Sequence, residues 1–69
     1  MKFVVTFPLG GPLRNCYTLL DADCELDARL VLMDEYGRSG WAGIYPASAE
    51  GRMRDEHGLA FIPFGPVRP

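Results

Sequence analysis

The sequence predicts an α+β fold, in which a single small domain runs β-β-α-β or β-β-α-β-β. The expected sheet is mainly antiparallel, has three or four strands and carries one helix on one face. Two observations support this class: short β-branched and aromatic segments precede one central segment with helical spacing, and glycines and prolines separate the segments. The 69 residues are 48% hydrophobic and 23% charged, which is typical of one globular domain.

Two strands are expected near the start of the chain. Residues 2–7 read Lys-Phe-Val-Val-Thr-Phe, and residues 16–21 read Cys-Tyr-Thr-Leu-Leu-Asp. Side chains alternate between the faces of a strand, so Phe3, Val5 and Phe7 should share one face. A glycine- and proline-rich loop of about eight residues joins the two segments, which predicts a long-looped hairpin.

The central segment predicts a helix over residues 24–36. Asp23 is expected as the N-cap, because a short oxygen acceptor there satisfies free N–H groups of the first turn. Gly37 is expected just after the last turn, where a left-handed conformation ends many helices. This helix is apolar over more of its surface than one covered face requires. Its two apolar lines are Cys24, Ala28, Val31 and Leu32, with Tyr36 beside them, and Leu26, Leu30 and Met33.

The third expected strand covers residues 41–45 and ends at Pro46. Alternation predicts that Trp41 and Tyr45 lie on the same face of this strand. Residues 47–57 are small and polar, so we expect a loop there. With no second helix, one face of the sheet should then stay uncovered and expose apolar side chains.

The chain is expected to end in a short edge strand and a tail. Residues 59–62 read Leu-Ala-Phe-Ile, which is the composition of a strand, and Pro63 stops it. The predicted domain therefore covers residues 1–62. Residues 63–69, which contain three prolines, are expected to form an extended tail.

Charge and motifs exclude several function classes. The net charge is −2, and residues 21–37 carry six acids against Arg29, which argues against a general nucleic-acid binder. Cys16, Cys24 and His57 do not have the spacing of a metal site, and nothing in the sequence marks a cofactor site or a catalytic constellation. We expect no enzyme activity, no signal peptide and no membrane segment. The expected location is the cytoplasm, with both cysteines as thiols.

Short motifs within residues 1–46 carry a family likeness. They are Met1-Lys2-Phe3-Val4-Val5-Thr6-Phe7, Pro12-Leu13-Arg14, Asp27-Ala28-Arg29, Tyr36-Gly37-Arg38, Trp41-Ala42 and Tyr45. With these motifs the chain resembles small uncharacterised proteins encoded by bacteriophages of GC-rich actinobacteria. It departs from them at Ser39-Gly40, and at Gly43, where a bulky residue is expected. The resemblance implies a phage or prophage origin and binding to a host protein, and it implies no catalytic residues.

The leading hypothesis is a protein-interaction module, such as a modulator or inhibitor of a host protein. Trp41 and Tyr45 are the expected partner-binding anchors, since aromatic residues dominate many interfaces, and Arg14 and Arg38 should add polar specificity. A nucleic-acid-binding accessory protein is the second hypothesis, and it would use Arg14, Arg38, Arg52 and Arg54. A self-assembling structural protein is the third, because so small a core favours oligomerisation.

Overall fold

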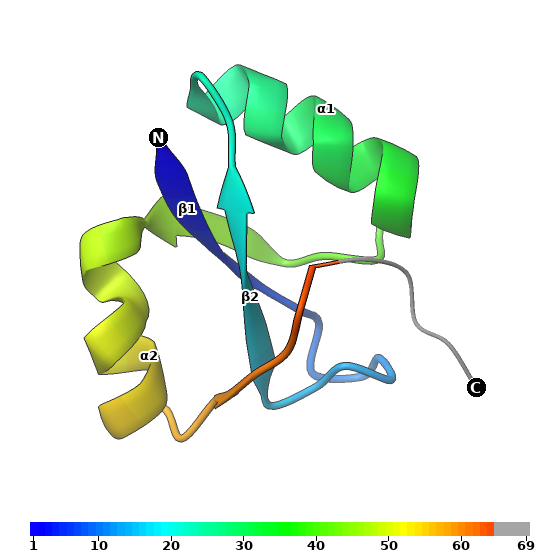
Figure 1. Cartoon of the computed structure of the whole chain (residues 1–69). Helices are drawn as coiled ribbons and strands as arrows, with labels where there is room; N and C mark the ends of the chain where they lie inside the picture. The colour runs from blue at the N-terminus through cyan, green and yellow to red at the C-terminus, as the bar shows by residue number, and fades with distance from the viewer. Residues whose placement is uncertain (65–69) are drawn as a thin grey trace.

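A computed structural model describes residues 1–64 and shows an α+β fold built on a four-stranded sheet of order β3-β1-β2-β4. The two α-helices lie on opposite faces of this sheet (Figure 1). The elements are β1 (Lys2–Thr6), β2 (Cys16–Asp21), α1 (Glu25–Tyr36), β3 (Gly43–Pro46), the 3₁₀ turn η1 (Ala47–Ala49), α2 (Glu50–Asp55) and β4 (Ala60–Phe61).

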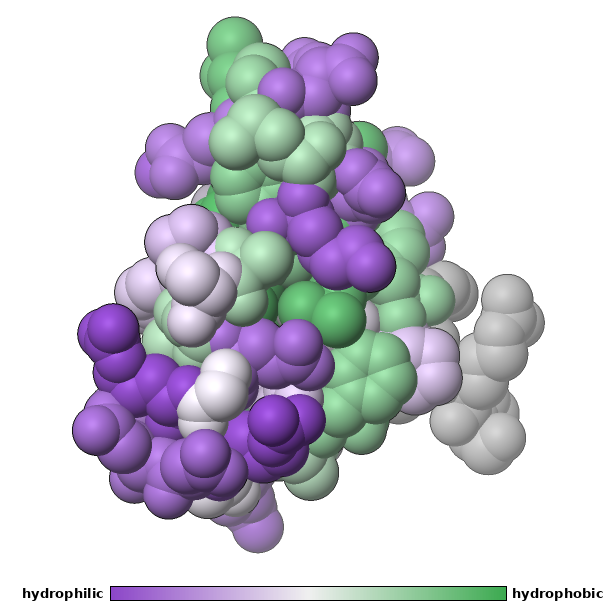
Figure 2. Space-filling model, turned by 60° about the vertical axis from the view of Figure 1, so that its left-hand side comes forward, coloured by the Kyte–Doolittle hydropathy of each residue, from purple (hydrophilic) through white to green (hydrophobic). Residues whose placement is uncertain are grey.

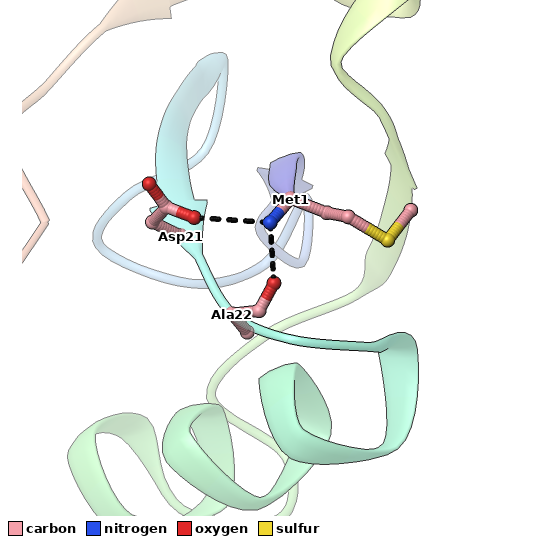
Figure 3. A network of polar contacts seen from close by, with 3 residues as sticks. All are labelled: Met1, Asp21 and Ala22. Atoms are coloured by element: carbon pink, nitrogen blue, oxygen red, sulfur yellow. Dashed lines mark hydrogen bonds and ion pairs between the residues drawn. The ribbon is translucent and has the colours of Figure 1, made fainter.

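Strands β1 and β2 form the predicted antiparallel hairpin. Their register runs from Lys2 opposite Asp21 to Thr6 opposite Tyr17. The Met1 amino group continues this pairing, because it donates to the Asp21 carboxylate at 3.2 Å and to the Ala22 carbonyl oxygen at 2.7 Å (Figure 3). These contacts hold the start of the chain against the segment that leads into α1.

Helix α1 covers the face that carries Phe3, Val5 and Phe7, as the alternation predicts. Ala28 and Leu32 of α1 are fully buried against this face. Three predicted details of the helix differ in the structure. The N-cap is Cys24 and not Asp23, and no side chain caps the first turn. Cys24 and Val31, both expected on the buried line, are exposed. Cys24 precedes the first helical residue, and Val31 lies beside the line that Ala28 and Leu32 form against the sheet. Gly37 has φ 78° and donates to the Met33 carbonyl at 3.0 Å, which confirms the predicted helix end.

The expectation of an uncovered sheet face is wrong. The segment predicted as a loop forms η1 and α2, whose Ala49 and Met53 pack against Val4 and Tyr17 on the second face. Pro46 fixes the backbone just before this segment, and the acid-first, base-last charge order favours a helix. The outward side of α2 is polar: hydrophilic side chains gather over it at the lower left of Figure 2. The second face is therefore part of the core.

The sheet is mixed, whereas the sequence predicted a mainly antiparallel arrangement. β3 pairs antiparallel with β1, but the short edge strand β4 runs parallel to β2. The chain can return in parallel because α2 forms part of a crossover from one edge of the sheet to the other. Phe64, placed in the predicted tail, packs on the first-face core with its ring 5.8 Å from that of Tyr36. Residues 65–69, the rest of the predicted tail, lie outside the described residues.

Candidate partner-binding surface

The main candidate for a binding surface is a line of apolar side chains on the solvent side of α1. Leu26, Leu30 and Met33 are 64%, 57% and 40% exposed. Their spacings of four and three residues place them on one side of the helix. The buried Ala28 and Leu32 lie on the other side, against the sheet. We call Leu26, Leu30 and Met33 the α1 stripe.

The two flanks of the α1 stripe differ in charge. Asp27 and Asp34 each directly follow a stripe residue, so both carboxylates lie on the same flank. Neither takes part in a salt bridge with any residue of the described range 1–64. The opposite flank carries Arg29. Its side chain forms a salt bridge of 3.6 Å with Glu25 and lies over the ring of Trp41, 5.9 Å from the centroid. The positive charge is thus engaged within the domain, while the negative charges face solvent.

The two aromatic residues predicted as anchors do not share a surface. Trp41 precedes β3, which begins at Gly43, so strand alternation does not extend back to it. Its ring is half-buried against the α1-side core, and its Nε1–H is buried without a hydrogen-bond partner in residues 1–64. Tyr45 instead pairs with Val4 and lies on the face that α2 covers. The prediction that the two share one face is wrong.

The Tyr45 side chain also lies over Gly43. A Cβ atom at Gly43 would lie 3.0 Å from the Tyr45 hydroxyl oxygen, so the tyrosine side chain occupies the space over the glycine. The exposed part of Tyr45 is 40% of the residue, and it is separate from the α1 stripe. A bulky residue at Gly43 would displace the Tyr45 ring.

Arg14 and Arg38 are exposed, and they lie at a second surface feature. A groove of about 490 Å³ lies between the β1–β2 loop and the end of α1, and its lining includes Phe7, Leu13 and Tyr36. Arg14 follows the lining residue Leu13, and Arg38 precedes the lining residue Ser39. The other two arginines of the nucleic-acid hypothesis, Arg52 and Arg54, belong to α2 on the other side of the sheet. The four arginines therefore sit on three separate segments.

A tyrosine–carboxylate contact lies on the second face of the sheet. The Tyr17 hydroxyl donates to Glu50 Oε2 at 2.9 Å, and Tyr17 is almost completely buried. Burial raises the pKa of Tyr17, and the hydrogen bond to the Glu50 carboxylate raises it further. Tyr17 does not line the groove, and its ring packs at 5.7 Å from that of Phe61. The pair braces β2 against the start of α2.

Residues 1–64 hold no cluster of three or more histidine, cysteine or acidic side chains placed to share a metal ion. Cys16 and Cys24 are free thiols. Within the same range, neither helix has the length and apolar character needed to cross a membrane.

The α1 stripe was visible in the sequence, but it was not among the residues predicted to bind a partner. Leu26, Leu30 and Met33 form the second apolar line of the predicted helix. A helix that covers one face of a sheet needs one apolar line, and the surplus line is the signal. What the sequence leaves open is which of the two lines meets the sheet.

Comparison with known proteins adds no relative: the chain matches no protein-family model, no curated protein and no solved structure.

Proposed function

We propose that this protein is a protein-interaction module that binds a partner through the α1 stripe and acts by binding rather than by catalysis. The observation that carries the proposal is the exposure of Leu26, Leu30 and Met33 as one line, opposite the side of α1 that packs on the sheet. Helix-in-groove and helix-on-helix recognition use apolar anchors at this spacing. Polar residues at these positions would serve the isolated domain equally well, so the stripe points to a partner.

Burial of the α1 stripe alone supplies only part of the binding free energy of a micromolar complex. Burial of a whole leucine or methionine side chain contributes roughly 1.5–3 kcal/mol, so the exposed parts of the three residues would contribute roughly 2–5 kcal/mol together. A dissociation constant of 1 μM corresponds to about 8 kcal/mol. Residues beside the stripe must therefore add to the affinity, and Trp41, which lies under Arg29 of the neighbouring flank, is an aromatic candidate.

The resemblance to actinobacteriophage proteins implies where the protein acts and on what kind of partner. On this reading the partner is a host protein, the chain modulates or inhibits it, and the complex forms in the host cytoplasm. The small size of the domain fits an action that depends on occupying a partner's surface.

The experiment is affinity capture from an actinobacterial lysate with paired variants, read by mass spectrometry. Leu30→Glu places a charge in the stripe, and Leu9→Glu makes the same change at a loop leucine that is 79% exposed. We expect a host protein that the natural chain and Leu9→Glu retain and that Leu30→Glu loses, with and without nuclease. Equal retention by Leu30→Glu would contradict the proposal. Retention that nuclease abolishes would favour the nucleic-acid hypothesis.

A further inference from the structure

We infer that the segment bound by the α1 stripe is an amphipathic helix with lysine or arginine beside its apolar seam. This inference rests on the proposed function and names its partner class. It is carried by the spacing of the stripe and by the unequal charges on its two flanks.

The spacing of the stripe is that of a helix–helix seam. Leu26, Leu30 and Met33 are separated by four and then three residues, which is the spacing of the two core positions of a heptad. Asp27 and Asp34 then occupy equivalent flanking positions one heptad apart, directly beside the seam. Charged residues at such positions select the partner helix and its orientation. A partner helix laid along this stripe would place its own flanking residues next to the two carboxylates.

The charge of the flank selects a basic partner. Asp27 and Asp34 are exposed and form no salt bridge within residues 1–64. Of the six acids in residues 21–37, Asp21 pairs with the Met1 amino group and Glu25 pairs with Arg29, so Asp27 and Asp34 are the uncompensated carboxylates beside the stripe. A lysine or arginine on the partner would meet two carboxylates whose charges the domain itself leaves uncompensated. An acidic partner would meet repulsion at the same two positions.

The same charges argue against a second copy of this chain as the occupant. Two copies joined through α1 would bring together two segments that each carry six acids and one arginine. The arginine is already held by Glu25 and Trp41, so pairing across such a dimer would break contacts within each domain. Like charges across an interface oppose association. The occupant is therefore a different, basic chain.

The test measures binding of two synthetic helical peptides to the full chain by fluorescence anisotropy. Both have three heptads with leucine at the seam, and they differ in carrying lysine or glutamate at the flanking positions. The protein variants are Leu30→Glu, the double variant Asp27→Asn/Asp34→Asn, and the control Asp55→Asn, which removes an exposed carboxylate of α2. Circular dichroism checks that each variant is folded.

We expect the lysine peptide to bind at least roughly tenfold more tightly than the glutamate peptide, and less tightly as salt increases. The double variant should weaken binding of the lysine peptide by roughly 2- to 30-fold, the range for two exposed ion pairs. The Asp55→Asn control should leave it unchanged, and Leu30→Glu should abolish it.

Equal binding of the two peptides, or no binding of either, would overturn the inference. Dimerisation of the natural chain in sedimentation velocity, lost in Leu30→Glu, would also overturn it and assign the stripe to a second copy. The proposed function has a separate test, because it fails when Leu30→Glu leaves lysate capture unaffected or when nuclease abolishes that capture. The two failures are therefore distinguishable.

Discussion

Leu30 and Leu32 lie two residues apart on α1, and we expect very different losses of stability when each is changed to alanine. Leu32 is fully buried and Leu30 is 57% exposed. A buried leucine changed to alanine loses transfer free energy and leaves a cavity, which together destabilise a protein by about 2–5 kcal/mol. A domain of 69 residues has a free energy of unfolding of roughly 3–10 kcal/mol. The Leu32→Ala variant should therefore lose a large part of its stability.

For Leu30→Ala the loss should be small. Less than half of this side chain is buried, so the transfer term is roughly 1 kcal/mol at most. Alanine is also the better helix former, by a few tenths of a kcal/mol, which offsets part of the loss. Urea denaturation followed by far-UV circular dichroism measures the loss of unfolding free energy in both variants. When the dependence on urea concentration has the same slope, the shift in midpoint gives this loss.

Destabilisation by Leu30→Ala as large as that by Leu32→Ala would contradict this prediction. Leu30 would then be a core residue, and the α1 stripe would be part of the fold and unavailable to a partner. A small effect at Leu30 with a large effect at Leu32 leaves the stripe free for binding.

Three further changes test the packing of the sheet and its connections. The buried Thr18 hydroxyl has no hydrogen-bond partner in residues 1–64, so Thr18→Val should raise the free energy of unfolding by about 1 kcal/mol, measured as a higher melting temperature. The pKa of Tyr17 is raised in the folded protein, so the unfolded chain loses this proton first. Stability should therefore fall as pH rises above the ordinary value of 10.0, and denaturation between pH 9 and 11.5 should show a shallower fall for Tyr17→Phe. A Cβ atom at Gly40 would collide with the Tyr36 carbonyl group, so Gly40→Ala should destabilise the domain by more than about 1 kcal/mol and lower its urea midpoint.

The first half of the fold could be predicted because its signals are local. The β-branched runs form β1 and β2, and their side chains face the sides of the sheet that alternation predicts. Strand β2 covers the predicted residues 16–21. Gly37 ends α1 as expected, since only a residue that tolerates positive φ fits there easily.

The second half depends on tertiary contacts. Helix α2 is six residues long and contains Gly51, so its propensity alone is weak, and burial of Ala49 and Met53 against Tyr17 stabilises it. The local signals of that helix are the spacing of Ala49 and Met53 and the order of its charges, and over so short a segment they do not distinguish a helix from a loop.

The candidate site could be predicted only in part, for a related reason. The surplus apolar line of α1 was evident, but aromatic residues at Trp41 and Tyr45 were the stronger signal for an interface. Their positions depend on where β3 begins, which the pattern of residues 41–45 does not fix. Because the strand starts two residues later than expected, Trp41 lies outside it and strand alternation does not place its side chain.

The most direct test of the α1 stripe as the partner-binding surface is site-specific photo-crosslinking. A photoreactive phenylalanine analogue replaces Leu30, and in a matched variant it replaces Leu9, which is more exposed than Leu30 and lies in the β1–β2 loop. After irradiation in an actinobacterial lysate, we expect one dominant crosslinked protein from position 30 and none from position 9. Crosslinking from position 9 alone, or equal products from both positions, would show that the α1 stripe is not the partner-binding surface.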